Sequence, residues 1–93
     1  NTRVREIIDE LQACHANVDI HEPYADPGEC ERECGFRPIG QPQPGTYDAI
    51  VIAVGHREYH DWGVVGIRAL AKTNAVIYDV KYVLPADAVD GRL

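Results

Sequence analysis

Residues 47–56, YDAIVIAVGH, carry the strongest structural signal in this chain of 93 residues. Five apolar residues follow one another from Ile50 to Val54, and a glycine and a histidine come directly after them. A continuous run of this kind is typical of a strand buried on both faces, as in a parallel sheet that helices cover. The run therefore predicts an α/β protein.

The N-terminal part predicts a helix and then a short strand. From Thr2 to about His15 the apolar residues recur every three or four positions, which is the pattern of an amphipathic helix with one buried face. Arg5 and Asp9 on the opposite face are spaced for an ion pair. Residues 17–22, NVDIHE, alternate apolar and polar side chains before Pro23, and this alternation indicates a strand.

A second, short helix is expected to begin after Asp26. Asp26 is a plausible N-cap, Pro27 suits the first helical position, Glu29 suits the third, and Gly35 suits the left-handed stop. The segment 36–46 that follows is rich in proline and glycine. It predicts a loop with at most a trace of strand near Ile39.

The C-terminal part predicts two helical pieces, a strand and an extended tail. The helical pieces lie within residues 57–74 and are separated near Gly63 and Gly66, and Asn74 is a plausible stop. Residues 75–80, AVIYDV, predict a second buried strand. Helices and strands thus alternate, which indicates a three-layer, Rossmann-like domain with a parallel sheet. Because such units normally open on a strand and this chain opens on a helix, we expect the first strand to be truncated and the chain to be a fragment.

Composition limits the classes of protein to which the chain can belong. Its 45% apolar and 26% charged residues fit one globular domain over residues 1–93. The net charge of −6 and the lack of a Lys/Arg cluster disfavour a nucleic acid polymer as partner. No apolar run could cross a membrane, and three cysteines, an odd number, favour reduced thiols in the cytoplasm over a disulfide framework.

Candidate site residues are those just past each predicted strand, because ligands of open parallel sheets bind beyond the carboxyl ends of the strands. This rule selects the segments 22–24, 55–56 and 79–82. Gly55 would let a ligand approach the backbone. His56 could contact a ligand, or it could pack on Tyr59 or cap the next helix. Lys81 could hold a phosphate or carboxylate, or it could pair with Asp79.

Other chemistries find little support in the sequence. Cys30 and Cys34 share a helical face, but structural zinc prefers a second cysteine or histidine pair, so packing is the better interpretation and no metal site is expected. The chain has neither G-x-G-x-x-G nor G-x-x-x-x-G-K-[ST], which argues against a dinucleotide site or P-loop of its own. No catalytic residue is predicted.

Four segments together resemble the C-terminal domain of the UDP-glucose/GDP-mannose dehydrogenase family, and most closely its UDP-N-acetylhexosamine 6-dehydrogenase branch. They are NTRVREIIDELQ, VDIHEPYADPGECERECG, YDAIVIAVGHREY and IRALAKTNAVIYDVKYVLPADAVDGRL. Only the loop at 36–46 is uncharacteristic. The resemblance implies a parent enzyme that oxidises the C6 alcohol of a UDP-sugar to a carboxylate in two NAD-dependent steps, through a covalent intermediate on a cysteine, in surface polysaccharide biosynthesis.

The resemblance also implies that different parts of the parent enzyme bind the cofactor, carry the catalytic residue and bind the substrate. Family members bind NAD on an N-terminal domain, carry the catalytic cysteine in a GGxCxP segment near a central dimerisation region, and bind the UDP-sugar partly on the domain seen here. None of Cys14, Cys30 and Cys34 stands in a GGxCxP context, so this chain alone should be inactive. We expect a parent that is a homodimer or larger.

Residue by residue, the resemblance points to four substrate-binding positions. Lys81 matches the Lys or Arg that reaches the nucleotide sugar, His56 matches a ligand-facing turn, and Gly55 and Asp79 adjoin them. His21 to Pro23 departs from the usual Tyr-Asp-Pro, and Arg92 is expected to be structural or subunit-facing. Two alternatives remain open: a non-enzymatic interaction or regulatory module, and a GDP-mannose 6-dehydrogenase.

Overall fold

The computed structural model describes residues 2–92 and divides them into two compact units, one up to Pro42 and one from Gln43. Each unit is described by itself. The helices and strands follow in the order α1 (Thr2–Ala13), α2 (Pro27–Cys34), β1 (Tyr47–Ile52), α3 (Arg57–Leu70), β2 (Ala71–Asp79), a 3₁₀ turn (Ala86–Ala88) and β3 (Gly91–Arg92). The prediction that the chain forms one domain stays a prediction.

The first unit contains the two helices α1, Thr2–Ala13, and α2, Pro27–Cys34. Ile8 is buried on the apolar face of α1, and the predicted ion pair is present, with 3.3 Å between Arg5 Nε and Asp9 Oδ1. Arg5 also donates a hydrogen bond to the backbone carbonyl of Cys34 at the end of α2. This bond connects the two helices of the unit.

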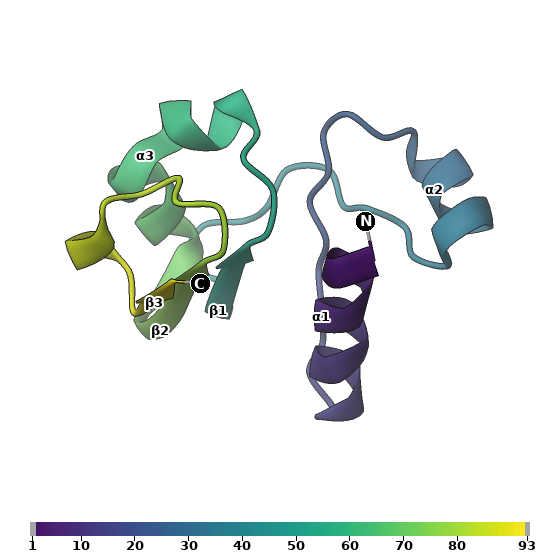
Figure 1. Ribbon diagram of the computed structural model, residues 1–93, viewed down its shortest axis with the longest axis horizontal. Coiled ribbons are helices and arrows are strands. Elements are labelled where there is room, and N and C mark those ends of the chain that lie inside the picture. Colours follow the sequence, from purple (N-terminus) through teal and green to yellow (C-terminus); the bar gives the residue numbers. More distant parts are fainter. Residues whose placement is uncertain (1, 93) are drawn as a thin grey trace. The chain divides into compact units, whose positions relative to one another are not determined.

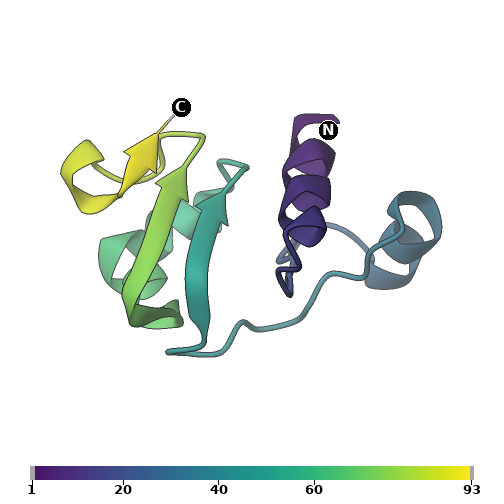
Figure 2. The same ribbon diagram turned by 90° about the horizontal axis from the view of Figure 1, so that it is seen from below.

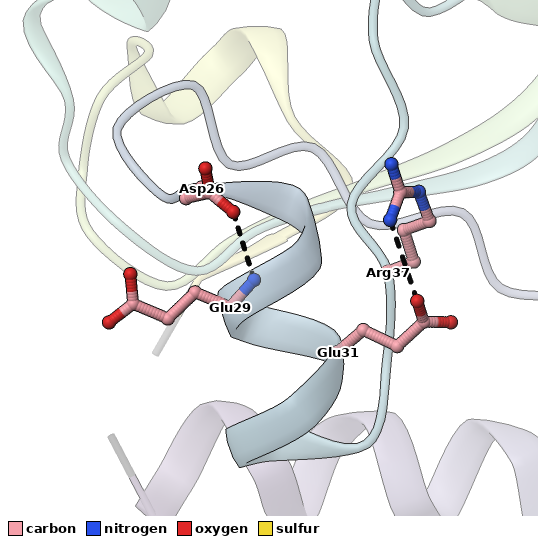
Figure 3. A network of polar contacts seen from close by, with 4 residues as sticks. All are labelled: Asp26, Glu29, Glu31 and Arg37. Carbon is pink, nitrogen blue, oxygen red and sulfur yellow. Dashed lines mark hydrogen bonds and ion pairs between the residues drawn. The ribbon is translucent and has the colours of Figure 1, made fainter.

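Helix α2 begins and ends where its sequence predicts. The Asp26 side chain accepts a hydrogen bond of 2.9 Å from the Glu29 backbone N–H (Figure 3). Pro27 occupies the first turn. Gly35 ends the helix with φ of 83°, a left-handed conformation that suits glycine. Beside the helix, Arg37 Nη1 lies 3.4 Å from Glu31 Oε1.

The prediction of a strand over residues 17–22 is wrong, because this segment does not form a regular strand. Only a single parallel bridge forms, between His21 and Ile39, with the Ile39 N–H donating to the Ile20 carbonyl at 2.8 Å. A strand needs a neighbour along its whole length to satisfy its backbone groups. Within the described residues Ile39 is the bridge partner, so the segment stays extended without becoming a ladder. The trace of strand expected near Ile39 is confirmed.

The second unit is a parallel sheet with one helix against it. β1, Tyr47–Ile52, pairs with β2, Ala71–Asp79, and β2 pairs with β3, Gly91–Arg92. Helix α3, Arg57–Leu70, connects β1 to β2 and lies over one face of the sheet (Figure 1, Figure 2). The α/β class with a parallel sheet is thereby confirmed.

The prediction that the strands are buried on both faces is wrong for this unit. From Ala75 onward the residues of β2 alternate, with Ala75, Ile77 and Asp79 buried and Val76 half exposed. In β1 only Ile52 is buried. The unit supplies one helical layer, so alternate side chains pack on α3 and the others do not.

Helix α3 confirms the break predicted near Gly63. This residue has φ of 63° and ψ of −168°, so two helical pieces meet there at a kink. The predicted stop at Asn74 is wrong, because the helix ends at Leu70 and β2 begins at Ala71. Tyr47 pairs with Ala71, and Asp48 Oδ1 lies 3.1 Å from Lys72 Nζ; the register then shifts, and regular pairing resumes between Ala49 and Val76.

The core of the second unit joins the sheet, the helix and the loop after β2. Its buried side chains come from all three parts: Ile52, Tyr59, Ile67, Ile77, Val83 and Leu84. Burying a side chain of this size stabilises the fold by about 1.5–3 kcal/mol. Since Val83 and Leu84 belong to this core, the loop that follows β2 is held at its start by β2 and further along by these two side chains.

Candidate functional site

The three parallel strands of the second unit end at one common edge. Ile52 of β1 pairs with Asp79 of β2, and Asp79 pairs with Arg92 of β3. The Val80 N–H extends this row by donating to the Ile52 carbonyl at 2.9 Å. The residues after β1 and β2, together with Arg92, therefore lie at the carboxyl edge of the sheet. We call this set, Gly55, His56, Lys81, Tyr82 and Arg92, the edge cluster.

Asp79 builds the turn beneath the edge cluster. Its side chain is fully buried, with Oδ1 accepting the Lys81 N–H at 3.1 Å and Oδ2 accepting the Leu84 N–H at 2.8 Å. Both carboxylate oxygens are thus used to order residues 80–84. This geometry supports a positioning role for Asp79, through its bonds to the backbone of the turn, more than a direct contact with a ligand.

The Lys81 side chain is exposed, while its backbone N–H is bonded to Asp79. Within residues 2–92 its ammonium group makes no ion pair, so the pairing with Asp79 weighed from the sequence is not formed. A Cβ placed on Gly55 would lie 3.8 Å from Lys81 Cβ, an ordinary contact distance. The structure therefore brings Gly55 and Lys81 together from the ends of neighbouring strands.

His56 stands at the start of α3. It occupies the N-cap position in an extended conformation, without a side-chain capping bond. Its ring is half-buried and lies 5.6 Å from the Tyr59 ring, which in turn lies 5.4 Å from the Trp62 ring. Of the structural roles considered for His56, packing on Tyr59 is present and helix capping is absent.

Tyr82 and Arg92 complete the edge cluster: Tyr82 belongs to the candidate segment 79–82, whereas Arg92 is expected from the sequence to be structural or subunit-facing. The Arg92 guanidinium carbon lies 4.0 Å from the centre of the Tyr82 ring, a cation–π geometry. Tyr82 has φ of 57°, an uncommon conformation for a residue other than glycine. The segment Asp90-Gly91-Arg92 was the available signal, because glycine before a charged residue at a strand end suggests close packing.

Other parts of the described chain offer weaker sites. A hollow of about 430 Å³ lies at the amino ends of β1 and β2, lined by Asp48 and residues 72–75, on the opposite edge from the edge cluster. Within residues 2–92 no group of His, Cys, Asp and Glu side chains could hold a metal ion. No helix among these residues is long and apolar enough to cross a bilayer.

The three cysteines are free thiols. Desolvation raises the pKa of the Cys30 thiol, and the hydrogen bond with Cys34 and the neighbouring charges raise it further. A raised pKa reduces the thiolate fraction at neutral pH, and the thiolate is the nucleophile. Cys30 is therefore poorly suited to covalent catalysis.

The residues of the edge cluster do not form a dinucleotide site. The turn from β1 into α3 contains one glycine, Gly55, whereas the dinucleotide fingerprint uses three glycines between strand and helix. A cation at this edge suits an isolated phosphate or diphosphate group better.

The chain is similar to known proteins over nearly its whole length. A family model described as the UDP-glucose/GDP-mannose dehydrogenase family, UDP binding domain, matches residues 1–86. Two curated relatives, from Salmonella typhi and Pseudomonas aeruginosa, are each named UDP-N-acetyl-D-glucosamine 6-dehydrogenase and are 42% and 40% identical over 93 residues. Protein CapL of Staphylococcus aureus is 28% identical over 90 residues.

These alignments cover nearly all of this chain and little of the relatives. The two 6-dehydrogenases are matched over 100% of the chain and 22% of their own length, and Protein CapL over 97% and 21%. No solved structure matches the chain.

Proposed function

Because the chain belongs to the UDP-glucose/GDP-mannose dehydrogenase family, as its UDP binding domain, we propose that it binds the nucleotide sugar in an NAD-dependent UDP-sugar 6-dehydrogenase. The names of the two most similar relatives described above make UDP-N-acetylglucosamine the first candidate substrate. Dehydrogenases of this kind generally use NAD. The family match favours this function over a non-enzymatic module, and the named relatives favour a UDP-sugar over GDP-mannose.

The proposal rests chiefly on one observation: the Lys81 side chain is exposed at the carboxyl edge of the sheet, beside Gly55. A nucleotide sugar presents a diphosphate there, and an ammonium group that pairs with no carboxylate in residues 2–92 is available to bind it. Gly55 leaves room for the ligand against the backbone, and His56 forms the rim. Asp79 holds the Lys81 backbone in place from below.

The chemistry itself belongs to parts of the parent protein outside this chain. Oxidising a primary alcohol to a carboxylate consumes two NAD⁺ and one water and releases two NADH and three protons. We assign to this chain the binding and orientation of the UDP-sugar, and to the remainder of the parent the NAD site, the catalytic cysteine and the contacts between subunits. Free thiols in a domain with an adequate core favour a cytoplasmic location.

An assay of the full-length parent tests this function. The purified protein is given NAD with UDP-N-acetylglucosamine, UDP-glucose or GDP-mannose in turn, and NADH formation is followed. We expect two NADH per molecule of UDP-N-acetylglucosamine and competitive inhibition by UDP. Failure to oxidise any of the three sugars, or a preference for GDP-mannose, would overturn the proposal.

A further inference from the structure

Arg92 is placed at the carboxyl edge by a set of contacts that begin at Asp90. The Ile77 N–H donates to Asp90 Oδ2 at 2.8 Å, and the Asp90 N–H donates to the Ile77 carbonyl at 2.8 Å. Arg68 of α3 donates to the Ala88 carbonyl at 3.2 Å and lies 3.8 Å from Asp90 Oδ2. Asp90 is thus fixed to β2 by two bonds and faces a cation from α3.

Gly91 lets β3 approach Tyr78 closely. A Cβ on Gly91 would stand 2.6 Å from two carbons of the Tyr78 ring, a distance that side-chain atoms do not tolerate. Past the glycine, the Tyr78 hydroxyl donates to the Arg92 carbonyl at 3.3 Å. The backbone of Arg92 is therefore held both by sheet pairing with Asp79 and by this bond.

The Arg92 side chain is held by Tyr82. An aromatic ring against the face of a guanidinium leaves the N–H groups around its rim free to donate. Tyr82 directly follows Lys81 in the turn that Asp79 orders. The two positively charged side chains of the edge cluster, Lys81 and Arg92, thus come from one structured turn and the strand beside it.

The edge cluster carries positive charge in an acidic chain. The chain as a whole carries a net charge of −6. Within residues 2–92, however, neither Lys81 nor Arg92 pairs with a carboxylate, and both oxygens of the nearby Asp79 are committed to backbone N–H groups. The positive charges of these two exposed side chains are therefore available to an anionic ligand that binds at this edge.

We propose that Arg92 is a second diphosphate-binding residue, which acts with Lys81 on the nucleoside diphosphate and is positioned for this contact by the Tyr82 ring. The inference rests on the proposed function and adds a residue and a ligand group to it. A planar guanidinium can donate two parallel hydrogen bonds to phosphate oxygens, whereas the lysine acts as a point charge. The pair suits a diphosphate, which offers more than one phosphate group.

The test measures binding of UDP, UMP and uridine to the full-length parent by calorimetry. For Arg92→Gln we expect UDP to bind at least about tenfold more weakly, UMP to lose less, and uridine to be unchanged. Tyr82→Leu, which removes the ring, should approach Arg92→Gln, whereas Tyr82→Phe, which keeps the ring, should retain more of the UDP affinity than Tyr82→Leu. Arg32→Gln, at an exposed arginine on α2, is the matched control.

The outcomes separate this inference from the proposed function. If the unaltered parent does not bind UDP, the proposed function fails. If it binds UDP and Arg92→Gln binds equally well, only the role of Arg92 fails. An equal loss for UDP, UMP and uridine would show a structural effect and would also overturn the inference. Arg92→Lys, which keeps the charge without the fork, should lie between the two extremes and guards against a variant that misfolds.

Discussion

Single residues at the carboxyl edge show what a sequence can and cannot reveal. Lys81 and Gly55 are each predicted as candidate contacts from their positions after two strands, and in the structure a Cβ added to Gly55 would lie 3.8 Å from Lys81 Cβ. The detailed role of Asp79 was not predictable. Its two bonds to backbone N–H groups depend on how residues 80–84 turn, and that turn depends on Val83 and Leu84 entering the core.

Replacing Lys81 tests the residue on which the proposed function depends. Lys81→Ala in the full-length parent should weaken UDP binding by about 1–3 kcal/mol, the value of a charged hydrogen bond. This corresponds to a dissociation constant roughly 5- to 150-fold higher, measured by calorimetry. Because the side chain is exposed and the turn is held by backbone bonds, folding should be little affected.

The control for this prediction is Lys72→Ala. Lys72 is also exposed, but it lies near the start of β2 and pairs with Asp48 at 3.1 Å. Its removal should leave UDP binding unchanged. Equal binding by the Lys81→Ala and unaltered proteins would assign Lys81 to a solvated turn.

Elements whose signals are local were predicted well, and elements that need a distant partner were not. The cap, the first-turn proline and the glycine stop of α2 all act within a few residues, as does the kink at Gly63. The segment 17–22 and the start of β2 depend on a neighbouring strand. Alternation along a sequence indicates that a strand could form, but it does not identify which strand will pair with it.

Strand β3 provides a prediction at this scale. Gly91→Ala would force a Cβ to within 2.6 Å of the Tyr78 ring, so either the ring or the strand must move. Overpacking of this kind costs about 1–3 kcal/mol. We expect faster hydrogen exchange in peptides covering residues 86–92 of the parent, and weaker UDP binding because Arg92 moves with its strand.

Gly40→Ala is the matched control for β3. Gly40 is exposed and no atom lies within 4 Å of the position that its Cβ would take, so neither exchange in 86–92 nor UDP binding should change. Unchanged UDP binding by Gly91→Ala, together with faster exchange, would show that the placement of β3 is not needed to hold Arg92 at the site.

At the scale of the whole molecule, electrostatics decides how a phosphate ligand can bind an acidic chain. The net charge of −6 disfavours a polyanionic partner, but it does not reveal where the few cations lie in the fold. That information comes from topology, because parallel strands bring residues 55, 81 and 92 to one edge. Composition gives the total charge, and the fold determines its local distribution.

This distribution predicts how salt affects ligand binding to the full-length parent. Mobile ions screen exposed charges over about 10 Å at 0.1 M salt, and both Lys81 and Arg92 are exposed. The dissociation constant of UDP should therefore rise as sodium chloride is added, while that of uridine stays nearly constant. In Lys81→Ala and Arg92→Gln the rise should be smaller, because fewer ligand contacts remain to be screened, whereas Lys72→Ala and Arg32→Gln should keep the full slope. Equal slopes in all five proteins would mean that neither cation meets the diphosphate.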